Sequence, residues 1–388
     1  MPTLTLDHGR RVTLTYFVAF IAIGMCVGLL GPTLPYLADM TGSGMSQIAI
    51  LFTARAMGTM LGSVLSGVLI DRFDGHRVLA AMLLLLAAGL AAVPFSQALI
   101  LLAAVMLLLG LAEVSVNAGA NTLLLWTHGT ASPPWISALH FCFGLGNMLV
   151  PLVLVAVLRL EFSFAWAFWL VALYVAVLLF PLLSQASPRP PDITVGNRPA
   201  SPPQDGWRLA IFLLMFGLYV GMEVTFAGWI TAYGVLSGLA PAEAALLVTL
   251  FWLTLSAGRL LAIPLIRLLS PWKVLCGCLA LGLFSALALH GRWLPLPLIA
   301  LLFGLAASAI FPTLFGLSNQ LMPISGRTTG WIFLSSGLGG MALPSLTGPL
   351  LERAGTGAFP LLLVALVGLL LLGLVALRAR VKRSTDRR

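Results

Sequence analysis

Long apolar runs separated by short groups of Pro, Gly and charged residues make up most of the chain. Crossing a bilayer takes about 20 mostly apolar residues. Within lipid a segment must also satisfy its own backbone hydrogen bonds, which favours a helix over an open strand. The sequence therefore predicts an all-α membrane protein with twelve transmembrane helices, near residues 13–38, 46–70, 77–95, 98–126, 134–158, 162–183, 209–234, 242–268, 274–290, 294–319, 328–350 and 358–378.

The composition agrees with this pattern. Of 388 residues, 60% are hydrophobic and only 9% are charged, and the mean hydropathy is +1.05. Soluble domains carry about 25% charged residues, so a soluble class is excluded. Four cysteines lie in apolar runs and lack the spacing of a zinc or disulfide framework: Cys26, Cys142, Cys276 and Cys278. We expect them to be small packing residues, and we expect no metal site and no cofactor.

The formal net charge of +9 is interpreted as a topology signal. With the N-terminus in the cytoplasm, sixteen of the 21 Lys and Arg residues fall in cytoplasmic segments. Cytoplasmic loops of membrane proteins carry such an excess of basic residues. We therefore predict an integral, multi-pass protein of a bacterial inner membrane with both termini in the cytoplasm. The basic residues are expected to attract anionic lipid headgroups modestly, and no nucleic-acid partner is expected.

A proline-rich segment divides the chain into two halves. Residues 184–208, "SQASPRPPDITVGNRPASPPQDGWR", hold six prolines and almost no apolar residues. This composition is typical of a flexible linker. It predicts an N-terminal six-helix bundle over 1–183 and a C-terminal six-helix bundle with a basic cytoplasmic tail over 209–388.

The two halves are interpreted as copies of each other. Four motifs recur in the same order at offsets of 193 to 197 residues. "GMCV" (24–27) matches "GMEV" (221–224), residues 62–79 match 258–275, "GLAE" (110–113) matches "GLAA" (304–307), and "GLGNMLVP" (144–151) matches "GLGGMALP" (337–344). A duplication is the simple cause of such a series. Two six-span repeats in the same orientation resemble the plan of the major facilitator transporters, whose solute site lies near the bilayer midplane.

Polar residues are distributed unevenly among the predicted spans. The third, sixth, ninth and twelfth spans hold no charged residue in their hydrocarbon cores, whereas the second, fourth, seventh and eighth do. A charge at the bilayer centre costs roughly 2.5–3.5 kcal/mol even on a lenient insertion scale. The charged side chains are therefore expected to face water, a solute or each other.

The fourth span carries an acid and two amides on one stripe. Glu113, Asn117 and Asn121 follow i, i+4, i+8 spacing and so share one helical face. A carboxylate with two amides can donate to and accept from several hydroxyl groups, which favours a sugar-like solute. The alternative is structural: a buried hydrogen bond between helices for Glu113, and interhelical amide bonds for the two asparagines.

The seventh span holds a second acid, Glu223, at the position that matches Cys26 of the first half. We predict that Glu223 also lies at the site for the solute or the coupling ion. An ion pair is the alternative, with Arg55 of the second span or Arg259 of the eighth as its partner. For each arginine a structural or gating ion pair is favoured over direct solute contact. Either carboxylate, Glu113 or Glu223, could change protonation during a transport cycle.

The fifth span adds two weaker candidates. His140 could relay protons or hydrogen-bond a sugar, or it could be a packed neutral histidine. Asn147 shares its general face. Three tryptophans, Trp229, Trp252 and Trp331, could stack on a pyranose ring, although interfacial anchoring or core packing is the favoured interpretation of each.

The loop between the second and third spans carries a family resemblance. "GVLIDRFDGHR" (67–77) resembles the signature loop of the major facilitator superfamily at five positions: Gly67, Asp71, Arg72, Gly75 and Arg77. Asp74 is an additional residue that lengthens the usual spacing of this motif by one. The resemblance implies that this loop latches the cytoplasmic side and that Asp71, Arg72 and Arg77 control the conformational switch.

Three stretches resemble a narrower group, the fucose, galactose and glucose symporters and the sodium-dependent glucose transporters. They are residues 52–72, 139–151 and 217–230. The spacing from Glu113 to Asn117 also resembles proton-coupled members, in which that acid is a coupling and binding site. Such members have an acid in the first span, whereas "FIAIGMCVGLLGP" has none. The coupling ion is thus left open between H⁺ and Na⁺.

These observations predict a monomeric secondary active transporter that moves a small polar solute, a sugar, by alternating access. Two alternatives stay open. One is a proton-driven exporter of hydrophobic or drug-like compounds, although the fourth span lacks the arginine common in such exporters. The other is a receptor with a transporter fold that binds solute without moving it. An enzyme is not expected, because no nucleophile elbow, phosphate loop or metal-ligand spacing is present.

Overall fold

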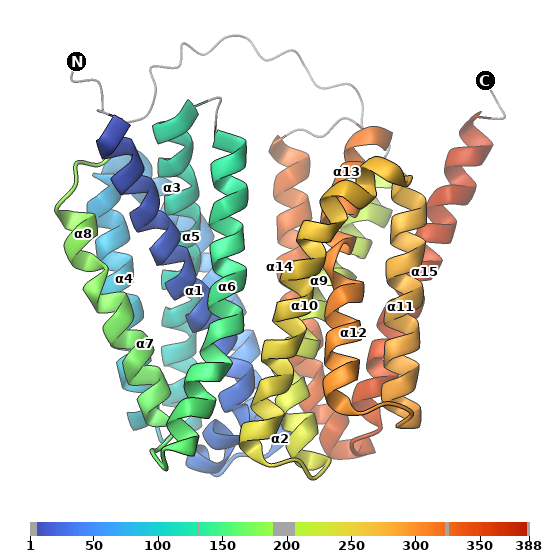
Figure 1. The fold of residues 1–388 in the computed structure, drawn as a ribbon, viewed down its shortest axis with the longest axis horizontal. Coiled ribbons are helices and arrows are strands. Elements are labelled where there is room, and N and C mark those ends of the chain that lie inside the picture. Colours follow the sequence, from blue (N-terminus) through green and yellow to red (C-terminus); the bar gives the residue numbers. More distant parts are fainter. Residues whose placement is uncertain (1–5, 130–131, 189–205, 323–325, 386–388) are drawn as a thin grey trace. The chain divides into compact units, whose positions relative to one another are not determined.

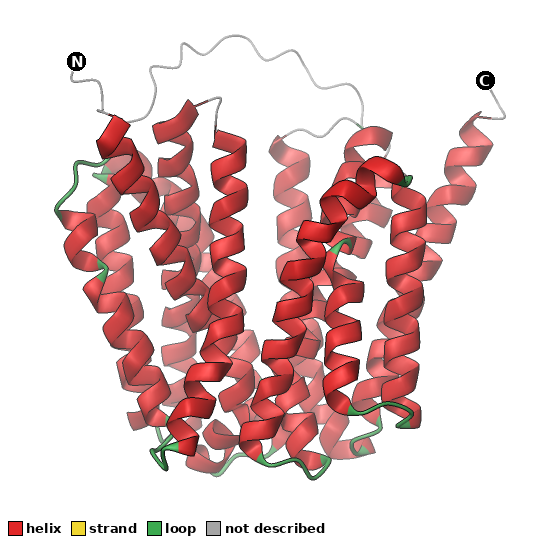
Figure 2. Cartoon of the chain, viewed as in Figure 1, coloured by secondary structure: helices red, strands yellow, loops and turns green. Residues whose placement is uncertain are grey.

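The computed structural model describes residues 6–129, 132–188, 206–322 and 326–385. Within these ranges the chain is built of helices joined by short turns and loops, with no strand (Figure 2). The helices form two compact units. Unit 1 comprises the described residues of Met1–Gly44, Ile50–Val195 and Ala240–Thr249, and unit 2 those of Met45–Ala49, Gly196–Leu239 and Leu250–Arg388.

Unit 1 is a bundle of long helices (Figure 1). In it α1 packs along α6, α3 along α5, and α4 against both α5 and α7. The elements are α1 (Leu6–Thr41), α3 (Ile50–Arg72), α4 (Gly75–Ala92) with the short 3₁₀ helix η1 (Val93–Phe95), α5 (Leu99–His128), α6 (Ser132–Arg159), α7 (Ala165–Val177) and α8 (Leu179–Leu183).

Unit 2 repeats this plan. In it α9 packs along α14, α11 against α12, and α15 against both α9 and α11. The elements are α2 (Met45–Ile48), α9 (Gly206–Leu236), α10 (Pro241–Leu268), whose first turns belong to unit 1, α11 (Pro271–Gly291), α12 (Leu296–Ser308), α13 (Ile310–Leu321), α14 (Gly326–Ala354) and α15 (Ala358–Thr385).

The predicted spans coincide with these helices. In the described part of the chain, eleven helical segments are long and apolar enough to cross a membrane. The predicted span 328–350 lies in α14, whose Gly, Ser, Thr and Pro residues lower its hydropathy. The division at a linker over 184–208 stays a prediction, because residues 189–205 lie outside the described residues.

Glycines lie at the closest helix crossings, and several of them belong to the duplicated motifs. In unit 1 a Cβ on Gly24 of α1 would clash with the carbonyl of Phe143 in α6. In unit 2 a Cβ on Gly221 of α9 would lie 2.7 Å from the carbonyl oxygen of Gly339 in α14. Only glycine lets the two backbones approach this far. The repeated motifs therefore mark equivalent contact points.

A second pair of crossings follows the same rule. In unit 1 a Cβ on Gly110 of α5 would clash with the carbonyl of Arg55 in α3. In unit 2 a Cβ on Gly304 of α12 would clash with the carbonyl of Phe251 in α10. Because the α3–α5 crossing occurs at Arg55 itself, it fixes the height at which that side chain meets α5.

The predicted span 294–319 is interrupted. It consists of α12 and α13, and Ala309 between them departs from ideal helical geometry (φ −99°, ψ −4°). Pro312 explains the break, because its ring has no N–H to donate to the Ser308 carbonyl and collides with it. The Tyr219 hydroxyl of α9 donates to the carbonyl of Ala307 at 3.0 Å, which satisfies a backbone group beside the break.

Candidate functional site

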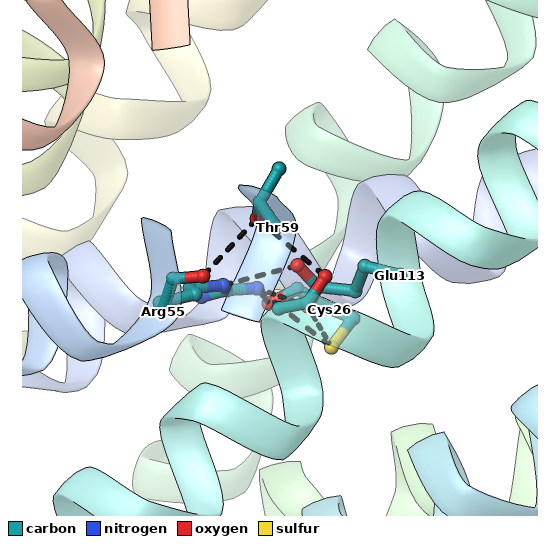
Figure 3. A network of polar contacts seen from close by, with 5 residues as sticks. Cys26, Arg55, Thr59 and Glu113 are labelled. Atoms are coloured by element: carbon teal, nitrogen blue, oxygen red, sulfur yellow. Dashed lines mark hydrogen bonds and ion pairs between the residues drawn. The ribbon is translucent and has the colours of Figure 1, made fainter. Parts of the chain in front are cut away.

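A buried charged cluster joins three helices of unit 1 (Figure 3). Arg55 of α3 donates from Nε to Glu113 Oε2 of α5 at 3.1 Å, and its Nη2 pairs with Glu113 Oε1. Arg55 Nη2 also donates to the carbonyl of Cys26 in α1 at 2.8 Å. The Cys26 thiol donates to Glu113 Oε1 at 2.7 Å. The Arg55 and Glu113 side chains are 11% and 7% exposed, so the pair lies inside the bundle.

The cluster is balanced in both charge and hydrogen bonding. Two N–H groups of the Arg55 guanidinium donate to the two oxygens of the Glu113 carboxylate, and Nη2 also donates to the Cys26 carbonyl of α1. Breaking a buried pair by removing one partner typically costs about 3–5 kcal/mol, because a lone charge is left behind. Removing the charge of Glu113 would therefore leave the Arg55 guanidinium without its counter-charge inside the bundle.

The two amides of the predicted stripe bond to each other. Asn121 Nδ2 donates to the main-chain oxygen of Asn117 at 2.9 Å and to its Oδ1 at 3.1 Å. Both side chains are partly exposed. The described hydrogen bonds do not link either amide to Glu113, which turns toward α3 and α1. The stripe therefore divides into a closed ion pair and an adjacent amide pair.

Unit 2 holds a looser ion pair. Arg259 Nη2 of α10 lies 3.9 Å from Glu223 Oε2 of α9, and the two side chains are 38% and 13% exposed. This separation is too long for a hydrogen bond. Arg259 Nε is buried without a hydrogen-bond partner among the described residues. Of the two arginines left open as the partner of Glu223, the structure pairs Arg259 with it and Arg55 with Glu113.

His140 and Asn147 lie on α6, away from these hydrogen bonds. The His140 side chain is exposed, and its ring meets Phe20 edge-on at 5.8 Å between centroids. Asn147 is fully buried and donates from Nδ2 to the carbonyl of Phe143 at 3.1 Å. Its Oδ1 lies against Gly28 of α1. Both stay predictions as site residues, and Asn147 contributes to the packing of α1 on α6.

The signature loop connects α3 to α4. Arg72 ends α3 and is exposed, as is Arg77 in the first turn of α4. The side chain of Asp71 lies outside what the structure describes. Asp74, the residue additional to the usual spacing, caps α4 by accepting from the backbone N–H of Arg77 at 3.0 Å.

His76 in the same loop makes two contacts that the sequence did not predict. The buried His76 ring lies 2.8 Å from the Tyr16 hydroxyl of α1 through Nε2. Through Nδ1 it lies 2.9 Å from the carbonyl oxygen of Gln185, just after α8. A carbonyl can only accept, so Nδ1 carries the proton in this arrangement. The loop is thus fastened to α1 and to the beginning of the predicted linker.

Cys26 is the other missed residue. It was interpreted as packing, and it donates a hydrogen bond to the central carboxylate instead. The signal was present in the repeat, because Cys26 occupies the position of Glu223 in the second half. In both units the first long helix, α1 or α9, therefore brings that position to an arginine of the next long helix, α3 or α10.

A family model of the Major Facilitator Superfamily matches residues 13–344. The chain belongs to the Major Facilitator Superfamily. It is 29% identical over 379 residues to sodium-dependent glucose transporter 1A of Mus musculus, covering 86% of this chain and 88% of that relative. The predicted membership, and the resemblance to this branch, are confirmed.

Solved structures share the fold at low sequence identity. A variant of the nucleoside transporter NupG superposes with a TM-score of 0.76 at 14% identity, covering 96% of this chain and 99% of that one. A D-xylose-proton symporter superposes with a TM-score of 0.74 at 12% identity, covering 94% and 97%. Superfamily membership makes the chain an integral, multi-pass membrane transporter of a small-molecule solute, and not an enzyme.

Proposed function

We propose that this superfamily member is a secondary active transporter that takes up a hydroxyl-rich solute, a sugar, by alternating access, driven by a gradient of H⁺ or Na⁺. The observation that carries the proposal is the buried cluster of Arg55, Glu113 and Cys26. A fully hydrogen-bonded ion pair inside a membrane bundle is a group whose state one small cation can switch. Similarity to glucose transporters over most of the chain supports a sugar as the solute.

Of the two coupling ions, we propose that H⁺ rather than Na⁺ acts at Glu113. Protonation would neutralise the carboxylate and weaken its two bonds to Arg55, while the Cys26 thiol could rotate to another acceptor. A sodium ion at the same carboxylate would lie beside the guanidinium, where two positive charges repel strongly at low dielectric. Sodium coupling would therefore need a different group of oxygen ligands.

The remaining polar groups suit a neutral polyol. The Asn117–Asn121 pair offers amide groups with partial exposure, and the Glu223–Arg259 pair is not closed by hydrogen bonds. Such groups can exchange their contacts for those of hydroxyls. We further propose that the protein acts as a monomer in a bacterial inner membrane.

Uptake into proteoliposomes tests the proposal. Purified protein would be given labelled hexoses under an imposed pH gradient or an imposed sodium gradient. We expect accumulation driven by the pH gradient. The Glu113→Gln variant should lose accumulation yet keep counterflow exchange, because the amide mimics the protonated acid. Glu243→Gln, an exposed carboxylate in the first turn of α10, is the matched control and should transport normally.

Three results would decide against parts of this scheme. If the wild-type protein accumulates no hexose under either gradient, the sugar symporter proposal is wrong. Accumulation with the sodium gradient alone would transfer coupling to Na⁺. Normal accumulation by Glu113→Gln would remove Glu113 from the coupling step.

A further inference from the structure

Among the described residues, three side-chain groups on α10 are buried without hydrogen-bond partners: the Thr249 hydroxyl, the indole Nε1 of Trp252 and the guanidinium Nε of Arg259. The two nitrogen donors, of Trp252 and Arg259, belong to unit 2. Trp252 is only 7% exposed. Both atoms carry a hydrogen and can only donate. Because a buried donor without an acceptor is unfavourable, native proteins contain few of them, and each calls for an explanation.

The two donors lie on one face of the helix. Trp252 and Arg259 are seven residues apart, close to two full turns, so their side chains project in nearly the same direction. Their Cα atoms are about 10 Å apart along the axis at 1.5 Å per residue. This spacing suits one small sugar and not a larger polymer.

Comparable side chains elsewhere in the protein are satisfied. The Trp229 indole, which is also buried, donates to the carbonyl of Pro344 at 2.9 Å. Arg55 Nε donates to Glu113 at 3.1 Å. Trp331 is 44% exposed and needs no internal partner. The unpaired donors of α10 are therefore a local feature and not a general property of tryptophan and arginine in this fold.

A hydrogen-bond acceptor lies beside Arg259. Glu223 of α9 is 3.9 Å from Arg259 and can accept from a hydroxyl. A ligand that fits this face must offer oxygen atoms to two donors and a hydroxyl hydrogen to a carboxylate. Sugar hydroxyls do both, since each one donates and accepts. An apolar drug-like molecule would offer no hydrogen-bond partner to the two donors or to the carboxylate.

We propose that the Trp252 indole N–H and the Arg259 guanidinium are a donor pair for solute recognition in unit 2, with Glu223 as the neighbouring acceptor. This inference rests on the proposed sugar transport and assigns part of its specificity to α10. Trp252, interpreted from the sequence chiefly as an anchoring or packing residue, is here a specificity-determining residue.

The test pairs Trp252→Phe with deoxy sugars. Phenylalanine keeps an aromatic ring and removes the N–H, and Trp331→Phe makes the same change at an exposed site. Initial rates of uptake would be measured for the transported hexose and for analogues that each lack one hydroxyl. We expect Trp252→Phe to raise KM about fivefold to tenfold, as for the loss of one hydrogen bond, with a smaller effect on the maximal rate.

The decisive readout is non-additivity. One deoxy analogue should lose affinity with the wild-type protein and lose little more with Trp252→Phe, because their shared hydrogen bond is already absent. Arg259→Lys keeps the positive charge near Glu223 but removes Nε–H, and it should show the same pattern with a different analogue. Trp331→Phe should behave as wild type throughout.

Each outcome supports or overturns the inference. If losses from Trp252→Phe and from every deoxy analogue are simply additive, the indole is a packing group and the inference is wrong. An unchanged KM in Trp252→Phe also overturns it, while leaving sugar transport established. If the wild-type protein transports no hexose but transports nucleosides or apolar compounds, the proposed function fails and this inference fails with it.

Discussion

Single residues in this protein gain their roles from the partner that a neighbouring helix supplies. Arg55 and Glu113 are both costly to bury alone, and each is tolerated because the other neutralises it. Cys26 completes the group as a donor to the carboxylate. In unit 2 the acid itself, Glu223, occupies the position of Cys26. Its ion pair with Arg259 is 3.9 Å long and is not hydrogen-bonded.

The closed pair makes a prediction about stability. Arg55→Gln and Glu113→Gln should each destabilise the protein by about 3–5 kcal/mol, because each leaves a buried charge unpaired. The double variant should be distinctly more stable than the sum of the two losses predicts. Thermal unfolding in detergent, followed by tryptophan fluorescence, measures the three variants side by side. Strictly additive losses would show that the two side chains do not act as a pair in the folded protein.

At the scale of the elements, close packing between pairs of helices stabilises the fold. The closest crossings are α1 with α6 and α3 with α5 in unit 1, and α9 with α14 and α10 with α12 in unit 2. Glycine lies at each of them, because lipid supplies little hydrophobic drive and close packing must hold the helices together. Some predicted spans are broken into shorter helices, for example between α7 and α8 and between α12 and α13, and Pro312 accounts for the break between α12 and α13.

A matched pair of glycines in α14 tests this account. A Cβ on Gly339 would clash with the carbonyl of Gly217, whereas a Cβ on Gly337 meets nothing within 4 Å. Gly339→Ala should therefore destabilise the protein by about 1–3 kcal/mol through overpacking. Gly337→Ala should be neutral or stabilising, by up to about 1 kcal/mol, since alanine favours helix. Equal melting temperatures for the two variants would contradict the close crossing.

At the scale of the whole molecule, two units of the same construction belong to one superfamily of transporters. The basic residues suggest how the chain is oriented in the membrane. Arg208, Lys273, Arg378 and Arg380 are all in segments assigned to the cytoplasm. Arg380 lies over the ring of Trp207 at 4.8 Å, a contact between the end of α15 and the start of α9 that suits a membrane interface.

Orientation can be measured with reporter fusions in bacterial cells. Green fluorescent protein fused to either terminus should fluoresce, and alkaline phosphatase fused there should be inactive, because both termini are expected in the cytoplasm. A phosphatase fusion in the α11–α12 loop, after Arg292, should be active. The reverse pattern at either terminus would contradict the predicted topology.

The sequence alone determined the architecture and the list of ionisable candidates. Apolar length predicts the spans, because lipid forces nearly the same solution on every chain. The internal repeat predicts two equivalent bundles, and several of the close helix crossings occur at the repeated glycines. The rarity of charges in lipid predicts that Glu113 and Glu223 are functional or paired.

Only the tertiary structure decided which groups meet. Periodicity places Glu113, Asn117 and Asn121 on one face of a helix, but it cannot show that Arg55 and Cys26 approach from two other helices and separate the acid from the amides. Nor can it show which tryptophan keeps its N–H unpaired, since that depends on whether a neighbouring backbone supplies an acceptor. The tertiary packing of the helices determines which residues distant in sequence come into contact, and the local sequence pattern does not predict these contacts.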